Sequence, residues 1–143
     1  MISSSGDYMS VIYLTNCSAK KDDELKGSGE MVSPKDLYTS QRIQNFIEKC
    51  KDEDVNWAIF SDNYGVYFPF DRHEWYDKPP SSVSDEEFDE LVNSFENRLA
   101  DFDRVIFYRE KDSFPDLFRD LVDSVDFDGE IILVDDLGSV GDF

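Results

Sequence analysis

Residues 11–21 read VIYLTNCSAKK, and this stretch decides the fold. It begins as a short apolar run and ends in small polar residues followed by two lysines. Apolar runs of about four to eight residues that are closed by turn-forming residues are typical of buried strands. We therefore expect a strand over residues 8–14 and a loop over residues 18–32. Ligands of open α/β proteins bind where loops leave the carboxyl ends of strands, so this loop is the first candidate for chemistry.

Three further apolar runs, over residues 56–60, 104–108 and 130–134, read as strands. Amphipathic helical patterns separate the four runs. Strands that alternate with helices predict an α/β fold in three layers, with a four-stranded parallel sheet, helices on both faces and right-handed crossovers. The chain of 143 residues has the length of one ordinary domain, so residues 1–143 are expected to form a single α/β domain.

Helix-start signals place the three helices. The first is expected over residues 34–52, after a serine N-cap and with a proline at its first position. Ser84 and Glu87 form a capping box for the second, and the third is expected to begin at Ser113. The segment 66–83 is rich in aromatic residues and prolines, which predicts an ordered excursion over the strand ends and not a flexible linker.

The formal charge of −19 is the strongest compositional feature. Such a surface repels phosphate backbones, so no non-specific nucleic-acid binding is expected at low salt. Two explanations compete for the acidity. One is halophilic adaptation, in which concentrated salt screens the self-repulsion of the carboxylates. The other is mimicry of nucleic acid by a protein that occupies a basic protein partner. The acids are spread over every predicted helix, which favours salt adaptation.

Other signals bound the location and the chemistry. The first ten residues lack the basic and apolar regions of a signal peptide, and no apolar run reaches the ~20 residues that span a bilayer. A cytoplasmic protein without membrane contact is therefore expected. The two cysteines form no CxxC or Cys/His cluster, so we predict no metal and no cofactor. The sequence also lacks the Walker A, GxGxxG, HExxH and GxSxG patterns.

Three stretches within residues 11–77 resemble, in order and spacing, motifs of a small family of functionally uncharacterised phage and archaeal proteins. They read NCSAKK over residues 16–21, DLYTS over residues 36–40 and SDNYGV over residues 61–66, and a later Pro69 and Tyr76 continue the pattern. The family motifs are Cys-Ser-x-x-Lys, Leu-Tyr-x-Ser and Ser-Ala-Lys-Tyr-Gly-Leu.

That family is distantly similar to the uracil-DNA-glycosylase-like domain that accompanies archaeosine synthase and other 7-deazaguanine modification enzymes. The resemblance implies a four-stranded parallel sheet and a pocket for a modified base or nucleotide. Asp62 and Asn63 stand where the family has alanine and lysine, and Val66 stands where it has leucine. The second loop therefore lacks the lysine that a phosphate would contact.

Cys17 and the lysines after it allow two interpretations each. Cys17 could be a nucleophile at a strand end, but no base is placed beside it. The favoured interpretation is that Cys17 is a small buried residue that fills a gap in the core. Lys20 and Lys21 could meet a phosphate, or they could be solvated lysines opposite the acids that follow them. Both interpretations of the lysines remain open on the sequence.

The leading functional hypothesis is a domain that binds or processes a base or nucleotide, linked to 7-deazaguanine-type modification of nucleic acid. No reaction is assigned, so whether the protein is an enzyme stays open. The alternative is a non-catalytic acidic module that binds another protein as a nucleic-acid mimic. The candidate ligand-binding residues are Asn16, Cys17, Ser18, Lys20, Lys21, Tyr38, Ser40, Ser61, Asn63, Tyr64 and Gly65.

Overall fold

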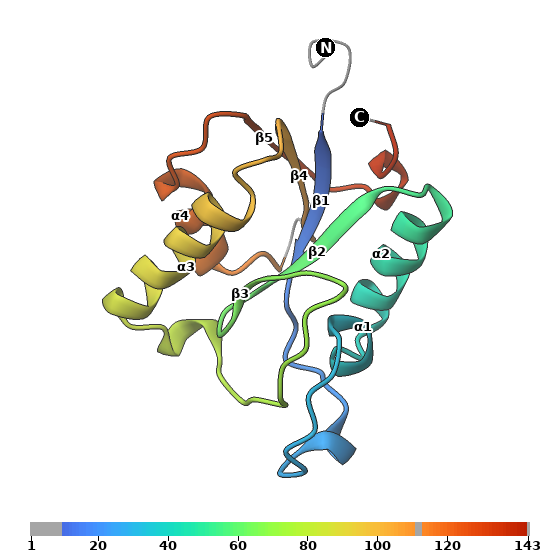
Figure 1. Ribbon diagram of the computed structural model, residues 1–143, viewed down its shortest axis with the longest axis vertical. Helices are drawn as coiled ribbons and strands as arrows, with labels where there is room; N and C mark the ends of the chain where they lie inside the picture. Colours follow the sequence, from blue (N-terminus) through green and yellow to red (C-terminus); the bar gives the residue numbers. More distant parts are fainter. Residues whose placement is uncertain (1–9, 111–112, 143) are drawn as a thin grey trace.

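The structure is a computed structural model, and it describes residues 10–110 and 113–142. Its centre is a five-stranded mixed sheet with the strand order β3-β2-β1-β4-β5 (Figure 1). The strands are β1 (Val11–Asn16), β2 (Asn56–Ser61), β3 (Gly65–Tyr67), β4 (Arg104–Tyr108) and β5 (Glu130–Val134). Four of them run parallel, and β3 pairs antiparallel with β2. The α/β prediction is confirmed in this coarser form.

The prediction of a four-stranded, all-parallel sheet is wrong, because the sheet has a fifth, short strand, β3, that runs antiparallel. The chain turns after β2 and returns at once as β3, with Ser61 opposite Gly65 and Ile59 opposite Tyr67. Three residues are too few to show an alternating pattern, and the sequence there reads only as a turn. Gly65 makes the return possible, since its φ of +73° is a conformation that other residues rarely adopt.

Helices cover both faces of the sheet (Figure 1). The face on one side carries α1 (Pro34–Leu37) and α2 (Gln41–Asp52), while α3 (Asp85–Arg98) and α4 (Asp116–Ser124) lie on the other. The predicted capping box of Ser84 and Glu87 is present at the start of α3. Short 3-10 helices stand in the connecting segments, namely η2 (Asp23–Leu25), η3 (Pro80–Ser82) and η4 (Leu137–Ser139).

The helix predicted over residues 34–52 is two helices. The chain is extended at Tyr38, which forms an isolated antiparallel bridge with Lys21, and Ser40 then caps α2 by accepting a hydrogen bond from the Ile43 amide. The break brings the loop after β1 against the start of α2. The helix that was expected to begin at Ser113 is α4, which begins at Asp116 after an N-cap at Pro115.

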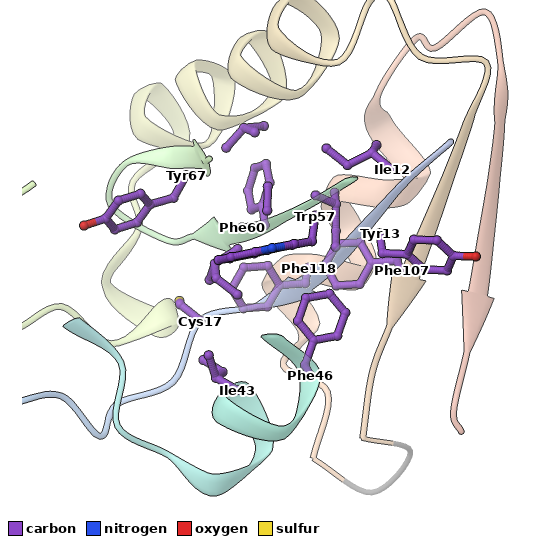
Figure 2. Packing of buried hydrophobic residues seen from close by; sticks show 14 of the residues in the cluster. Ile12, Tyr13, Cys17, Ile43, Phe46, Trp57, Phe60, Tyr67, Phe107 and Phe118 are labelled. Atoms are coloured by element: carbon purple, nitrogen blue, oxygen red, sulfur yellow. The ribbon is translucent and has the colours of Figure 1, made fainter. Parts of the chain in front are cut away.

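The first strand begins at Val11 and runs two residues past its predicted end, to Asn16. The predicted start at residues 8–9 lies outside the described residues. The central strands β1, β2 and β4 are buried almost throughout, as parallel strands between two helical layers must be. Figure 2 shows the aromatic side chains Tyr13, Trp57, Phe60 and Phe107 of these strands in the core, with Phe46 and Phe118 from the helices.

Candidate functional site

The carboxyl ends of β1 and β2 lie side by side and are tied together. Asn16 pairs with Phe60 in the parallel register, and the Cys17 amide donates to the Phe60 carbonyl at 2.9 Å. One residue further, the Asp62 amide contacts the Cys17 sulfur at 3.4 Å. The structure therefore brings together the two strand-end segments that the sequence singled out.

A pocket of about 350 Å³ opens at these strand ends. Ligand pockets of proteins occupy roughly 300–1,000 Å³, so this one suits a small ligand. The pocket draws on the loop after β1, the turn after β2 and the segment that leads to η3. The residues that line it are Cys17, Ser18, Ala19, Lys21, Asp62, Asp77, Lys78, Pro79 and Pro80.

A chain of buried hydroxyl groups lies next to Cys17 and Asp62. The Tyr76 hydroxyl is 2.6 Å from the Tyr38 hydroxyl and 3.0 Å from Ser61 Oγ. Ser61 Oγ accepts the amides of Asn63 and Tyr64, both at 3.0 Å. Those two bonds use its lone pairs, so its own hydrogen points to Tyr76. Burial raises the pKa of both Tyr38 and Tyr76, which keeps the two phenols neutral.

Lys21 is one of two lysines that line the pocket, and its side chain is unusually buried for a lysine, with the residue only 8% exposed. Its Nζ atom lies 4.3 Å from the ring centre of Tyr76 and 6.0 Å from that of Tyr38. A lysine ammonium over an aromatic face is attracted by the ring electrons. Nζ also donates to the Ala19 carbonyl at 3.5 Å. Within the described part of the chain, no carboxylate lies within ion-pair distance of Lys21.

Asp62 is the most unusual residue of the pocket. It is 3% exposed, and its Oδ1 atom is buried without a hydrogen-bond partner. Burial raises the pKa of this carboxyl group, while hydrogen bonding with Tyr76 and Cys17 and the charge of Lys21 oppose the shift. Buried polar atoms in proteins are nearly always paired, and each exception calls for an explanation. The other such side-chain atom in the described residues is Trp75 Nε1, outside the pocket lining.

Cys17 is not activated as a nucleophile. It is 8% exposed, and burial, followed by the nearby Asp62 charge, raises the pKa of its thiol to about 12. The thiolate is the reactive form of cysteine, so a thiol with this pKa is inert at neutral pH. The structure favours the packing interpretation of Cys17. Figure 2 shows its side chain at the border of the core.

Three of the predicted residues support the loop without lining the pocket. The Ser40 side chain caps α2, and Asn16 Nδ2 donates to the Cys17 carbonyl at 3.3 Å. Lys20 is exposed, and its carbonyl accepts the Thr39 amide at 3.2 Å. The structure thus separates the two lysines that the sequence left undecided, because Lys21 faces the pocket and Lys20 does not line it.

Asn63, Tyr64 and Gly65 lie around the corner from the pocket. They line a smaller hollow of about 230 Å³, which shares Asp62 and Lys78 with the pocket. The Tyr64 ring stacks on His73 with 3.9 Å between ring centres, and its hydroxyl donates to the Glu74 carbonyl. Tyr64 is therefore engaged by the protein itself.

The candidate set predicted from the sequence missed six residues of the pocket lining and the neighbouring Tyr76. The six are Ala19, Asp62, Asp77, Lys78, Pro79 and Pro80. Tyr76 and Asp77 belong to the predicted excursion over the strand ends, but no local pattern shows which of its residues return to β2. Asp62 was noted only as a replacement in the family motif. A carboxylate directly after a buried strand was the signal that could have identified it.

The topological switch of the sheet lies elsewhere, between β1 and β4, where the connections leave in opposite directions. Arg42 fills that position from α2. Its guanidinium donates to Thr15 Oγ1 at 2.7 Å and to the Asn16 carbonyl at 2.8 Å, and it pairs with Glu110 at 3.2 Å. The candidate residues at the ends of β1 and β2 therefore lie one strand away from the switch point.

A hollow of about 360 Å³ at Pro80 and Pro115 matches the pocket in size, and two others are larger still but carry less chemistry. One, of about 540 Å³, lies between α3 and α4 and has Asp85, Asp120 and Asp123 in its wall. The other, of about 480 Å³, includes Trp57 and Phe70. Neither is lined by a buried polar side-chain atom without a partner. The pocket at the ends of β1 and β2 is accordingly the best candidate site.

Among the residues that the structure describes, no group of three or more His, Cys, Asp or Glu residues is arranged to hold a metal ion. Within those same residues, no helix combines the length and the apolarity that a membrane crossing requires. Comparison with protein-family models, with curated proteins and with solved structures found no match to this chain.

Proposed function

We propose that the pocket at the ends of β1 and β2 binds a nucleobase, either free or as part of a nucleoside or nucleotide. The observation that carries the proposal is the buried Asp62 carboxylate, which lines a pocket of about 350 Å³ and whose Oδ1 has no hydrogen-bond partner among the described residues. A ligand with N–H groups at its edge would supply the missing hydrogen bond. Nucleobases carry such N–H groups on a flat, otherwise apolar ring.

The other walls of the pocket fit the faces of a base. Ala19, Pro79 and Pro80 contribute apolar surface, and Lys21 contributes hydrogen-bond donors. The Ser18 hydroxyl donates to the Lys20 carbonyl at 3.2 Å, so it offers the pocket an acceptor. Ligand pockets commonly combine apolar walls with a small number of polar groups that orient the ligand. The resemblance of residues 11–77 to the phage and archaeal family points to the same ligand class.

The proposal assigns binding and no reaction. A thiol with a pKa of about 12 offers no nucleophile, and the Tyr38 and Tyr76 phenols are held neutral by burial. A place in 7-deazaguanine-type modification would then rest on recognition of a base by this domain.

A thermal-shift screen of the full chain against nucleobases, nucleosides and nucleotides tests the proposal. A ligand at 100 times its Kd stabilises a protein by about 2.7 kcal/mol. For a chain of this size that is a rise in Tm of about 5–10 °C. Ala19→Trp should fill the pocket and abolish the rise. The matched control is Ala100→Trp, since Ala100 is also exposed and lies outside the pocket.

Two outcomes would contradict the proposal. One is the absence of any Tm rise with the wild-type protein across the three compound classes. The other is a rise that Ala19→Trp retains in full, because binding would then occur elsewhere on the molecule.

A further inference from the structure

Resting on the proposed function, we infer that the ligand presents a lactam edge, a ring N–H next to a C=O, and carries no phosphate at the pocket. Asp62 would accept the N–H and Lys21 would donate to the C=O. Guanine, hypoxanthine and uracil have such an edge in their nucleosides, whereas adenine and cytosine do not.

Asp62 is the hydrogen-bond acceptor for the N–H of the ligand. Asp62 lines the pocket, and its buried Oδ1 receives no hydrogen bond from the residues that the structure describes. The proposed contact takes Asp62 in its ionised form, which the charge of Lys21 favours against the effect of burial. An ionised carboxylate has acceptor sites and no donor. The group that completes it must therefore be a donor, and a ring N–H that meets a carboxylate makes a charge-assisted bond. A ligand that offers a lone pair at this position would be repelled.

Lys21 is the hydrogen-bond donor for the C=O of the ligand. Its ammonium group has three donors and no acceptor, and in the described residues its hydrogen-bond partner is the Ala19 carbonyl at 3.5 Å. Lys21 and Asp62 both line the pocket and influence each other electrostatically, yet they form no ion pair. A ligand that lies between them and carries a donor beside an acceptor satisfies both at once.

The charges around the pocket argue against a phosphate. Lys21 and Lys78 face Asp62 and Asp77, so the lining has two residues of each sign. Lys78 is already paired with Glu87, and this hydrogen bond lowers the pKa of Glu87 to about 2. The chain as a whole has a formal charge of −19. Among the residues that line the pocket, Lys21 is therefore the one cation without an ion pair that a phosphate would meet, and the surrounding field would repel the phosphate.

Isothermal titration calorimetry of the full chain with matched nucleosides tests the inference. Inosine and adenosine differ at the edge in question, because inosine has N1–H and C6=O where adenosine has a lone pair and an amino group. We expect wild-type protein to bind inosine more tightly than adenosine by about tenfold or more, and uridine more tightly than cytidine to a similar extent. Inosine 5′-monophosphate should bind no more tightly than inosine.

Two variants with matched controls assign the roles. Asp62→Asn should weaken inosine binding by about tenfold and reduce the preference over adenosine, whereas Asp89→Asn, the same change at an exposed residue outside the pocket, should leave the preference intact. Lys21→Gln should weaken inosine binding, and Lys20→Gln should not. Thermal unfolding of each variant confirms that it is folded.

The outcomes separate this inference from the proposed function. Adenosine that binds as tightly as inosine, or a preference that Asp62→Asn leaves unchanged, overturns the lactam edge while base binding stands. Inosine 5′-monophosphate that binds about tenfold more tightly than inosine overturns the exclusion of phosphate. If none of the nucleosides or bases binds the wild-type protein, both the inference and the proposed function are wrong.

Discussion

Replacing Asp62 by asparagine is expected to stabilise the protein while it impairs ligand binding. The change keeps the shape of the side chain and removes a charge from a residue that is 3% exposed. Leaving a buried polar atom without a partner costs about 1–3 kcal/mol, and more when the group is charged. Asparagine still carries polar atoms, so we expect a gain of about 1–2 kcal/mol at pH 7, or a Tm higher by about 3–6 °C.

The gain should depend on pH in a defined direction. Burial raises the pKa of Asp62 in the folded protein above its ordinary value of 3.8. The folded state therefore holds this proton more tightly than the unfolded state does. The stability that protonated Asp62 contributes is fully present below pH 3.8 and is lost as the pH rises through the folded-state pKa of Asp62. Asparagine does not titrate, so its advantage should be largest at neutral pH and should disappear in acid.

Urea unfolding followed by far-ultraviolet circular dichroism measures both effects, at pH 7 and at a series of lower pH values. Asp77→Asn serves as the control because Asp77 is exposed in the same pocket. The reasoning is refuted if Asp62→Asn is less stable than the wild-type protein at pH 7, or if the difference between them is the same at every pH. Proteins commonly hold such destabilising groups at functional sites.

Three other perturbations have defined results. Gly65→Ala should destabilise the fold by about 1–2 kcal/mol or more in urea unfolding, because φ is +73° and an added Cβ would lie 2.6 Å from the Ser94 Cβ; unchanged stability would contradict this. Iodoacetamide should modify Cys17 in the native protein at least about 100-fold more slowly than in the unfolded protein, because the Cys17 thiol is buried and has a pKa of about 12. Rapid labelling of the native protein, measured by mass spectrometry, would instead support Cys17 as a nucleophile. The Tm should rise with potassium chloride as the Debye length falls below ~10 Å, because the charge of −19 repels itself; a flat curve would count against salt adaptation.

Most of the fold could be predicted because its elements carry strong local signals. The apolar runs that became β1, β2 and β4 are buried on both sides, and such runs are recognisable without knowledge of the neighbours. The edge strand β5 is only partly buried, but its run of apolar residues is equally clear in the sequence. The capping box identified the start of α3. By contrast, β3 has three residues and exists because it pairs with β2, and the break at Tyr38 exists because that residue bridges to Lys21. Both depend on contacts that no local window contains.

The candidate site was predictable in its position along β1 but not in its composition. A polar segment after a buried strand marked Cys17, Ser18 and Lys21, which do line the pocket. The sequence could not distinguish Lys21 from Lys20, because the bridge to Tyr38 decides which of them turns inward. Nor could it show that the segment before η3 returns to the strand ends and encloses Asp62.

The central claim is that a base binds beside Cys17, Lys21 and Asp62. The most direct test is a series of ¹H–¹⁵N correlation spectra of the full chain during titration with inosine or uridine. The account predicts that amide shifts change at residues 17–21, at Asp62 and at residues 77–78, with little change at Trp57 and Phe70 in the hollow near the other end of the strands. Changes confined to that second hollow, or spectra that do not change at all, would contradict the claim.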